Sequence, residues 1–418
     1  MSFQYIKNGG VASAKGFKAV GVTAGIKVSG KPDMSLIFSE SPANFAGVFT
    51  TCSFAAAPVR VCQKRVKEIE TVQAIIVNSG NANACTGVEG IKNAELMCER
   101  IAAKLDLPNG ASDVLVSSTG RIGVQLDFSL IDHGIDLAIK AIKNHKYAEL
   151  DNNLLSAEAI MTTDTVPKYC AVEVTAASGK KYTIGAMTKG AGMIDPEMKA
   201  VPHATMLCYV VTDAQLNNQQ LTKLLGDSAE KSFNCINIDG DMSTNDTMLI
   251  LANGTSGVAI DENSQDEEIF ATALDDLSIK LAKEMVIDGE GVTKLVTIDI
   301  EGANNDTDAK QCANAIANSL LCKTAWFGGD PNWGRVIAAA GYSKVDFVPE
   351  DVKMYYDEYL VVENGMPTDV AEEVLAKEVL AKDNFTVRLV LGNGKGKCRM
   401  WTNDISYEYV KINAEYHT

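Results

Sequence analysis

The stretch KGAGMIDPEMKAVPHATMLCYVVTDA, from Lys189 to Ala214, joins a loop rich in glycine, methionine and proline to an apolar run. The run at 206–212 is continuously apolar and rich in β-branched residues, which is typical of a buried strand. Thr205 stands at its start, directly after Ala204. Thr205 therefore has two interpretations. It begins a buried strand, or the chain is cut before it and Thr205 becomes a new N-terminus.

The second interpretation has a chemical motive. An N-terminal threonine carries a hydroxyl nucleophile and an α-amino group on one residue, and such an amine titrates at about 7.7–8.0, close to working pH. Threonine paired with its own N-terminal amine is a known form of activated nucleophile. The spacing alone favours the simpler interpretation as the start of a strand.

Around this stretch, apolar patterns of strand and helix period alternate along the chain. Strands are predicted at 74–77, 114–116, 170–174, 182–187, 206–212, 248–252, 294–300 and 387–391. Helices are predicted at about 94–105, 130–143, 217–231, 266–287, 308–319 and 368–381. Several predicted strands come in pairs joined by Gly/Asn turns, so strands and helices do not alternate strictly along the chain. The patterns predict a mixed-sheet α/β sandwich rather than a purely parallel sheet.

Composition excludes several classes of function. The net charge is −16 over 418 residues, whereas nucleic-acid binding requires a basic face. The N-terminus lacks the apolar core of a signal peptide, and no apolar run reaches the ~18 residues that a membrane span requires. Cys85, Cys98, Cys170 and Cys208 lie in apolar sequence surroundings, as free cysteines do, and this usage suits a reducing compartment better than a disulfide framework. We expect a cytoplasmic protein without membrane or nucleic-acid partners.

No motif predicts a metal or an organic cofactor. Zinc sites of standard spacing need Cys or His pairs that are absent from a chain with four histidines. Gly190-Ala191-Gly192 follows a predicted strand, but the sixth position of a dinucleotide motif would be Asp195 instead of glycine. No phosphate-binding GxxxxGK[ST] loop is present.

Three groups of polar residues are candidates for chemistry. Thr119 and Gly120 lie in SSTGRIG (117–123), which is either a strand-to-helix turn or a loop whose hydroxyl and N–H groups stabilise an oxyanion. Thr162 and Thr163 cluster beside an acid, as helix-capping residues commonly do. Lys189 and Glu290 adjoin glycine-rich loops, where they are either surface charges or anchors for a zwitterion.

Short motifs follow one another nearly from end to end of the chain. They are KGFKAVGVTAGIK, IVNSGNANACTG (76–87), SSTGRIG (117–123), AIMTTDTVPK (159–168), KGAGMI (189–194), ATML (204–207), FNCINIDGDMSTNDT (233–247), GEGVTKLVTI (289–298), GGDPNWGRVIAAAGYS (328–343) and YVKINAEYHT (409–418). On these motifs, taken in order, the chain resembles the ornithine acetyltransferase family, also called glutamate N-acetyltransferase, of arginine biosynthesis.

The resemblance implies the family's α/β sandwich with a smaller C-terminal α/β region. It implies self-cleavage between Ala204 and Thr205, which would give an α chain (1–204) and a β chain (205–418) that assemble as α2β2. Thr205 would take the acetyl group from N-acetylornithine and pass it to glutamate by a ping-pong mechanism, and acetyl-CoA is a possible second donor. Neither a metal nor a cofactor is implied.

Site residues are also carried over from the resemblance. Thr119 and Gly120 match oxyanion-hole positions. The matches to substrate-binding positions are Thr162 or Thr163, Lys189, Thr205, Glu290, Asn413 and Thr418. Only one of the two neighbouring threonines is expected to point inward, because adjacent strand residues face opposite sides.

Two other functions remain open. The same self-cleaved scaffold could be an amidase or aminopeptidase that hydrolyses small amides, with water in place of glutamate. An uncleaved protein that binds acidic amino acids is the other alternative. It is suggested by five residues, Lys199 to His203, interposed just before the scissile bond where the family pattern passes directly to ATML.

Overall fold

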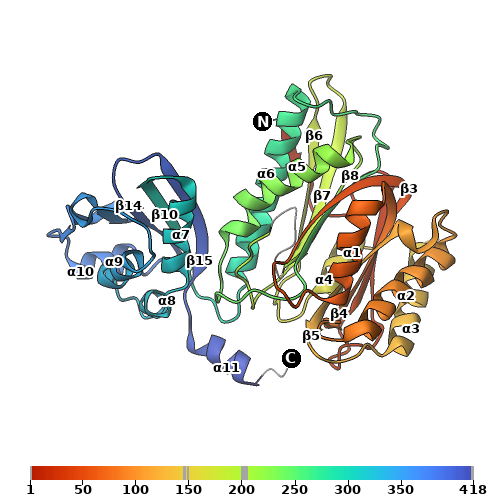
Figure 1. Cartoon of the computed structure of the whole chain (residues 1–418), viewed down its shortest axis with the longest axis horizontal. Helices are drawn as coiled ribbons and strands as arrows, with labels where there is room; N and C mark the ends of the chain where they lie inside the picture. The colour runs from red at the N-terminus through yellow and green to blue at the C-terminus, as the bar shows by residue number, and fades with distance from the viewer. Residues whose placement is uncertain (1, 145–146, 148–149, 199–205, 416–418) are drawn as a thin grey trace.

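The computed structural model describes residues 2–144, 147, 150–198 and 206–415, and Figure 1 shows two units of unequal size. In the part of the chain that is described, nine strands form the larger sheet, in the order β1-β6-β7-β8-β9-β3-β4-β5 with β2 paired to β3. Their bounds are β1 (Phe3–Tyr5), β2 (Phe17–Val22), β3 (Met34–Phe49), β4 (Thr71–Asn81), β5 (Val114–Arg121), β6 (Lys168–Thr175), β7 (Lys181–Lys189), β8 (Leu207–Thr212) and β9 (Thr247–Ala252).

The sheet is mixed, as the sequence predicts. β8 runs parallel to β9, and β4 runs parallel to β5, whereas the β7–β8 and β9–β3 pairs are antiparallel. β8 is buried on both faces: Leu207 and Tyr209 join one apolar core, while Cys208 packs in the other. Burial on both faces explains why this strand is continuously apolar in sequence instead of alternating.

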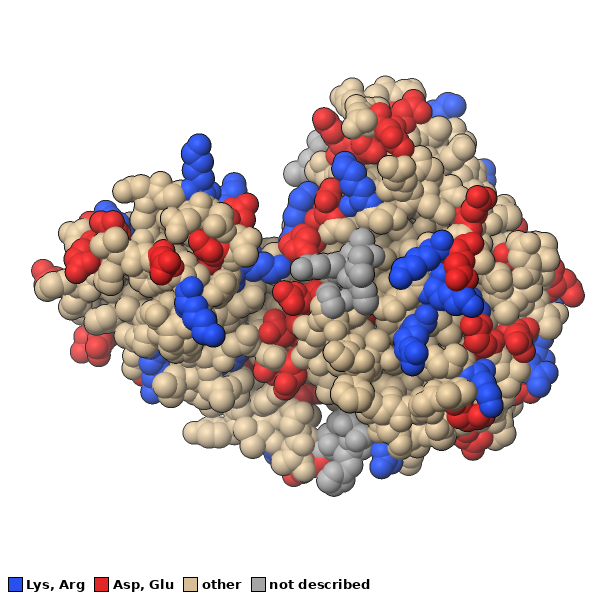
Figure 2. Space-filling model, in the orientation of Figure 1, with Lys and Arg blue, Asp and Glu red and all other residues tan. Residues whose placement is uncertain are grey.

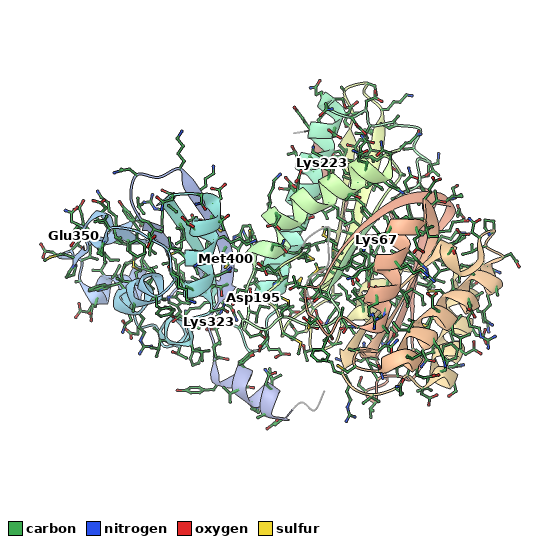
Figure 3. The ribbon with its side chains drawn as sticks, viewed as in Figure 1. Lys67, Asp195, Lys223, Lys323, Glu350 and Met400 are labelled. Carbon is green, nitrogen blue, oxygen red and sulfur yellow. The ribbon has the colours of Figure 1, made fainter. Side chains whose placement is uncertain are left out.

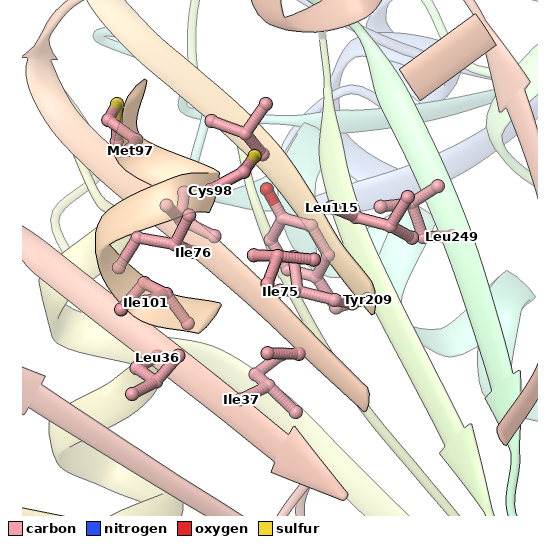
Figure 4. Close-up of a cluster of buried hydrophobic side chains, with 14 of the residues drawn as sticks. Leu36, Ile37, Ile75, Ile76, Met97, Cys98, Ile101, Leu115, Tyr209 and Leu249 are labelled. Atoms are coloured by element: carbon pink, nitrogen blue, oxygen red, sulfur yellow. The ribbon is translucent and has the colours of Figure 1, made fainter. Parts of the chain in front are cut away.

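Two groups of helices pack on this sheet. α1 (Ala57–Glu68), α2 (Gly87–Leu105), α3 (Phe128–Ile142) and α4 (Asn152–Ile160) pack on β2 to β5, and α5 (Asn218–Lys231) and α6 (Gln265–Ile287) pack mainly on β3, β6 and β7. Figure 4 shows part of the first core, in which Tyr209 of β8 lies among Ile75 of β4, Leu115 of β5 and Leu249 of β9. The two cores share the central strands, so β8 and β9 tie the unit together.

The smaller unit is the C-terminal α/β region that the resemblance implies. Its sheet has the order β13-β12-β11-β14-β10-β15 in the described residues. The strands are β10 (Leu295–Ala303), β11 (Lys353–Tyr356), β12 (Tyr359–Glu363), β13 (Met366–Pro367), β14 (Asn384–Val390) and β15 (Gly396–Asn403), and the helices are α7 (Asp306–Ala317), α8 (Leu320–Phe327), α9 (Trp333–Gly341) and α10 (Glu372–Glu378). The helix predicted at 368–381 was too long at both ends, because α10 spans only Glu372–Glu378.

The junction between the units is polar. Figure 2 shows acidic side chains gathered along it, and Figure 3 places Asp195 and Lys323 there. Lys323 is buried and donates hydrogen bonds to the Thr402 hydroxyl at 2.6 Å and to the Asn403 side-chain oxygen at 2.9 Å. From the smaller unit, α11 (Tyr407–Glu415) extends back beneath the larger one (Figure 1).

All ten cysteines are described, and all are free thiols. Among the described residues, no helix combines the length and apolar character that crossing a membrane requires.

Candidate active site

The ends of several strands meet at one edge of the larger sheet. Asn245, just before β9, donates through its side-chain amide to the Ala82 carbonyl at 2.6 Å and the Ser118 carbonyl at 2.7 Å. These two bonds tie the start of β9 to the ends of β4 and β5. Lys189, at the end of β7, pairs with Leu207 at the start of β8. The end of β5, the end of β7 and the segment just before β9 therefore lie together at this edge.

Thr119 and Gly120 occupy the end of β5. Thr119 is buried, and Gly120 pairs with Gly80 across the parallel β4–β5 ladder. Gly120 has φ +125°, and a Cβ there would lie 2.5 Å from the Gly80 carbonyl carbon. Any side chain at 120 would thus be strained and would clash with the backbone. The close packing of two glycine backbones holds the loop in a defined conformation.

Lys189 is the cation at the centre of the site. Its ammonium group donates to the Thr162 hydroxyl at 2.8 Å and to the Thr119 hydroxyl at 3.3 Å, and it lies 4.0 Å from the Asp164 carboxylate. Burial lowers the pKa of Lys189, and the Asp164 carboxylate opposes this shift. A buried ammonium that contacts neutral hydroxyls is well suited to accept a substrate carboxylate.

Beneath Lys189 lies a buried ion cluster. Lys168 donates to Asp164 at 2.8 Å and to Asp288 at 2.5 Å, and all three side chains are at most 5% exposed. Asp164 also accepts from the Gly190 N–H at 2.7 Å and from the Thr162 N–H at 3.0 Å. Burial alone would raise the pKa of Asp164, but the Lys189 and Lys168 ammonium groups outweigh it and hold the pKa well below its usual range. The cluster fixes the backbone on both sides of the site.

Glu290 supplies the opposite charge. It is buried, its N–H donates to the Ala191 carbonyl at 2.8 Å, and its carboxylate accepts from the Asn413 amide at 2.7 Å. A Cβ at Gly192 would lie 2.6 Å from the Glu290 carboxyl carbon, so any larger residue there would have to displace the Glu290 carboxylate from this position. Asn413 comes from α11, which brings the C-terminal segment to the larger unit.

These residues enclose a cavity of about 170 Å³. It is lined by Thr119, Gly120, Ile122, Thr162, Thr163, Lys189, Gly192, Met193, Ser243, Asn245, Glu290 and Asn413. Both threonines line it, contrary to the expectation that only one would face inward. That expectation assumed a strand, whereas the segment between α4 and β6 is a bend without strand pairing. Ala204, Thr205 and Thr418 lie outside the described residues.

Asp246 is a residue that the sequence analysis did not select. It is fully buried, and neither carboxylate oxygen has a hydrogen-bond partner among the described residues. Burial raises its pKa well above the usual range, and the nearby Lys189 opposes the shift. The N–H of Thr247, the next residue, donates to the Met206 carbonyl at 2.7 Å. Asp246 lies just before β9, outside any strand or helix pattern, so the sequence does not predict that its side chain is buried.

Replacement of Asp246 by asparagine should make stability less dependent on pH. Because the folded-state pKa lies above the unfolded value of about 3.9, the acid stabilises the fold only below that value, and this contribution is lost as pH rises through the folded pKa. We expect the free energy of unfolding of Asp246→Asn to rise relative to that of wild type as the pH is raised from 4 to 8. Urea unfolding at these two pH values measures the difference, and a gap that stays constant with pH would contradict the expectation.

The fold is that of an α/β enzyme, and its candidate site is a small cavity lined by a buried cation, Lys189, and a buried anion, Glu290. A sequence model of the ArgJ family matches residues 18–418, and the chain belongs to this family. The protein named arginine biosynthesis bifunctional protein ArgJ of Geobacter sulfurreducens is 44% identical over 409 residues, which cover 97% of this chain and 100% of the relative.

Other relatives extend the comparison. The glutamate N-acetyltransferase of Methanocaldococcus jannaschii is 43% identical over 418 residues, with 98% of this chain and 99% of the relative covered. A crystal structure of ornithine acetyltransferase from Mycobacterium tuberculosis, complexed with ornithine, is 38% identical with a TM-score of 0.42. That match covers 47% of this chain and 99% of the solved chain.

Proposed function

We propose that the protein transfers an acetyl group from N-acetylornithine to glutamate, giving ornithine and N-acetylglutamate. The observation that carries this proposal is the pairing of a buried cation and a buried anion, Lys189 and Glu290, across one cavity beside Thr119 and Gly120. The cation suits a substrate carboxylate and the anion suits an ammonium group. The names of the two relatives, at 44% and 43% identity, agree with this chemistry.

In the proposed mechanism, Thr205 is the nucleophile and its own α-amino group is the base. The hydroxyl attacks the acetyl carbonyl and loses its proton to the amine, and ornithine leaves with a proton on its α-nitrogen. The acetyl group remains as an ester until the glutamate amine attacks it. The Thr119 hydroxyl and the Gly120 N–H stabilise the oxyanion of each step, a contribution of ~2.7–4 kcal/mol per donor in comparable sites.

The proposed nucleophile requires cleavage of the Ala204–Thr205 bond, which gives chains of residues 1–204 and 205–418. The strand pairing supports the expectation that these chains stay together. β7 would belong to the first chain and β8 to the second, and they pair in antiparallel register from Ile184↔Thr212 to Lys189↔Leu207. Because both strands are buried, their separation would expose two apolar cores. We further propose that the two chains assemble as α2β2. We also propose a location in the cytoplasm, and the ten free thiols agree with that reducing compartment.

One experiment tests the cleavage and the transfer together. Mass spectrometry of the purified protein should show one chain that ends at Ala204 and another that begins at Thr205. Incubation with N-acetylornithine carrying a labelled acetyl group should then move the label to glutamate. Release of the label as free acetate at the same rate with and without glutamate would instead establish the amidase alternative. Ligand binding without turnover would establish a binding protein.

Replacement of Glu290 by glutamine should weaken the N-acetylornithine half-reaction most. N-acetylornithine carries a permanent side-chain ammonium, whereas glutamate must react as a free amine, so the donor depends more on a carboxylate partner. Loss of a charge-assisted hydrogen bond of ~1.5–3 kcal/mol predicts a rise in KM for N-acetylornithine of about tenfold to hundredfold. Steady-state kinetics with each substrate varied measures this. Glu408→Gln, an exposed acid on α11, is the matched control and should leave both KM values unchanged.

A further inference from the structure

The Glu290 carboxylate occupies the space that a side chain at position 192 would otherwise take. A Cβ on Gly192 would lie 2.6 Å from the Glu290 carboxyl carbon and from Oε1, and 2.7 Å from Oε2. The backbone of Gly192 is not in the left-handed region, so other residues could adopt its conformation. What glycine provides here is therefore the missing side chain, which leaves room for the carboxylate beside the backbone.

The loop that follows Gly192 is held by a second carboxylate. The Met193 N–H donates to Asp239 Oδ2 at 2.6 Å, and the Ile194 N–H donates to Oδ1 at 2.8 Å. Met193 has φ +59°, a conformation that is uncommon for residues other than glycine. The two bonds from neighbouring residues to one carboxylate stabilise this turn. Asp239 therefore determines where the backbone of Gly192 lies relative to Glu290.

The same carboxylate also reaches α11. The Tyr409 hydroxyl donates to Asp239 Oδ2 at 3.3 Å. One turn further along α11, the Asn413 amide donates to the Tyr409 carbonyl at 3.0 Å and to Glu290 Oε2 at 2.7 Å. Asp239 is thus connected to the Glu290 carboxylate by two routes, one through the loop at 192–194 and one through α11. Both routes act on the position of the anion in the cavity.

The cation of the cavity is held in a similar way. The Lys189 ammonium donates to the Thr162 hydroxyl at 2.8 Å and to the Thr119 hydroxyl at 3.3 Å. Lys189 and Gly192 belong to the same short loop, and both line the cavity of about 170 Å³ together with Glu290. The two charges are therefore each positioned by hydrogen bonds before a ligand arrives. A ligand that is charged at both ends must match their separation.

We propose that Gly192 and Asp239 determine the chain length of the amino acid that the cavity accepts, by setting how far the Glu290 carboxylate lies from the Lys189 ammonium. Gly192 is the specificity-determining residue, and Asp239 is a positioning residue. The inference rests on the proposed function, because ornithine is the part of the donor that spans the two charges. 2,4-Diaminobutyrate is one methylene shorter and lysine is one methylene longer. A mismatch of one methylene typically changes discrimination by about 10-fold to 200-fold.

The test is calorimetry of the purified full-length protein with the three free diamino acids. Wild type should bind ornithine about tenfold or more tightly than either homologue. In Gly192→Ala, the added methyl group and the displaced carboxylate both shorten the space. Ornithine binding should weaken about tenfold or more, while 2,4-diaminobutyrate binding is retained, so the order of the two is reversed. Gly226→Ala on α5, where a Cβ would meet nothing within 4 Å, is the matched control and should preserve the wild-type order.

Two further variants test the anion and its support. Glu290→Asp withdraws the carboxylate by one methylene, so the preference should move from ornithine toward lysine. Asp239→Asn keeps both charges of the cavity but replaces one acceptor oxygen by an amide NH₂ group, which cannot accept from the Met193 or Ile194 N–H. We expect the KM for N-acetylornithine to rise about tenfold in Asp239→Asn, with little change in kcat, because the reacting groups are untouched.

Several results would overturn the inference. They are no binding of ornithine by wild type, equal binding of the three diamino acids, and an equal loss of all three in Gly192→Ala. An unchanged KM in Asp239→Asn would remove the role of Asp239. If Gly192→Ala does not fold, Glu290→Asp decides, and an unchanged preference for ornithine in that variant contradicts the proposal. A wild type that ranks the diamino acids by length but transfers no acetyl group would refute the proposed function alone, since binding is measured without turnover.

Discussion

Replacement of Thr205 by alanine is expected to abolish both chain cleavage and acetyl transfer. Alanine has no hydroxyl to attack the Ala204 carbonyl and none to hold the acetyl group as an ester. Loss of a nucleophile in comparable acyl-transfer sites lowers kcat by about 10⁴-fold or more. A denaturing gel should show one full-length chain instead of two halves, and the labelled-acetyl assay should show no transfer.

Thr205→Ser is the control that separates chemistry from folding. Serine retains the hydroxyl and the α-amino group, so cleavage and transfer should both persist at reduced rates. The decisive contrary result is a Thr205→Ala protein, or an uncleaved wild type, that still moves acetyl from N-acetylornithine to glutamate. The N-terminal threonine would then not be the nucleophile, although the cavity with Lys189 and Glu290 would still bind the substrates.

Replacement of Lys168 by methionine is expected to cause the largest loss of stability. Methionine fills a similar volume but leaves Asp164 and Asp288 buried without their shared cation. Removal of one partner from a buried ion pair typically costs about 3–5 kcal/mol. Denaturant unfolding should show this decrease in the free energy of unfolding. Transfer activity should also fall, because Asp164 holds the Gly190 and Thr162 backbone N–H groups beside the site.

Lys181→Met is the matched control for this prediction. Lys181 lies 2.5 Å from Glu173, as close as Lys168 lies to Asp288, but its side chain is 55% exposed compared with 1% for Lys168. Water screens an exposed pair, so its loss should change stability little. Equal effects of the two substitutions would show that burial does not determine the strength of the Lys168 cluster.

Much of the larger sheet follows from sequence pattern. The sequences of β8 and α6 have regular apolar patterns without an interior glycine or proline. The predicted ranges, 206–212 and 266–287, each differ from the observed element by one residue at one end. β3 (Met34–Phe49) was not predicted, although at 16 residues it is the longest described strand. Its alternation is interrupted by a polar segment with a proline, and its pairing with β4 shifts register between Phe38 and Ala43. Such irregularity hides a strand from periodicity.

The candidate site was predicted unevenly. Motif resemblance selected Thr119, Lys189, Glu290 and Asn413, and the structure brings these four around one cavity. Their roles in binding and catalysis remain proposals. The ion cluster beneath them was not predicted, because Asp288 is 120 positions from its partner Lys168 and no local pattern connects the two. The conformation of the loop at 24–27 was not predicted either, because it depends on four backbone N–H groups that donate to the buried carboxylate of Asp33.

The sequence by itself determined the local elements, the chemical types available and the family, because periodicity and short motifs are properties of neighbouring residues. Only the tertiary structure decided which charges share a cavity. Lys189 reaches Thr119 across 70 positions because β5 and β7 end, and β8 and β9 begin, at one edge of the sheet. Burial there removes water from the ammonium and the hydroxyl and strengthens the hydrogen bond between them. Strand register, set by the packing of two cores, therefore turns common surface residue types into a site.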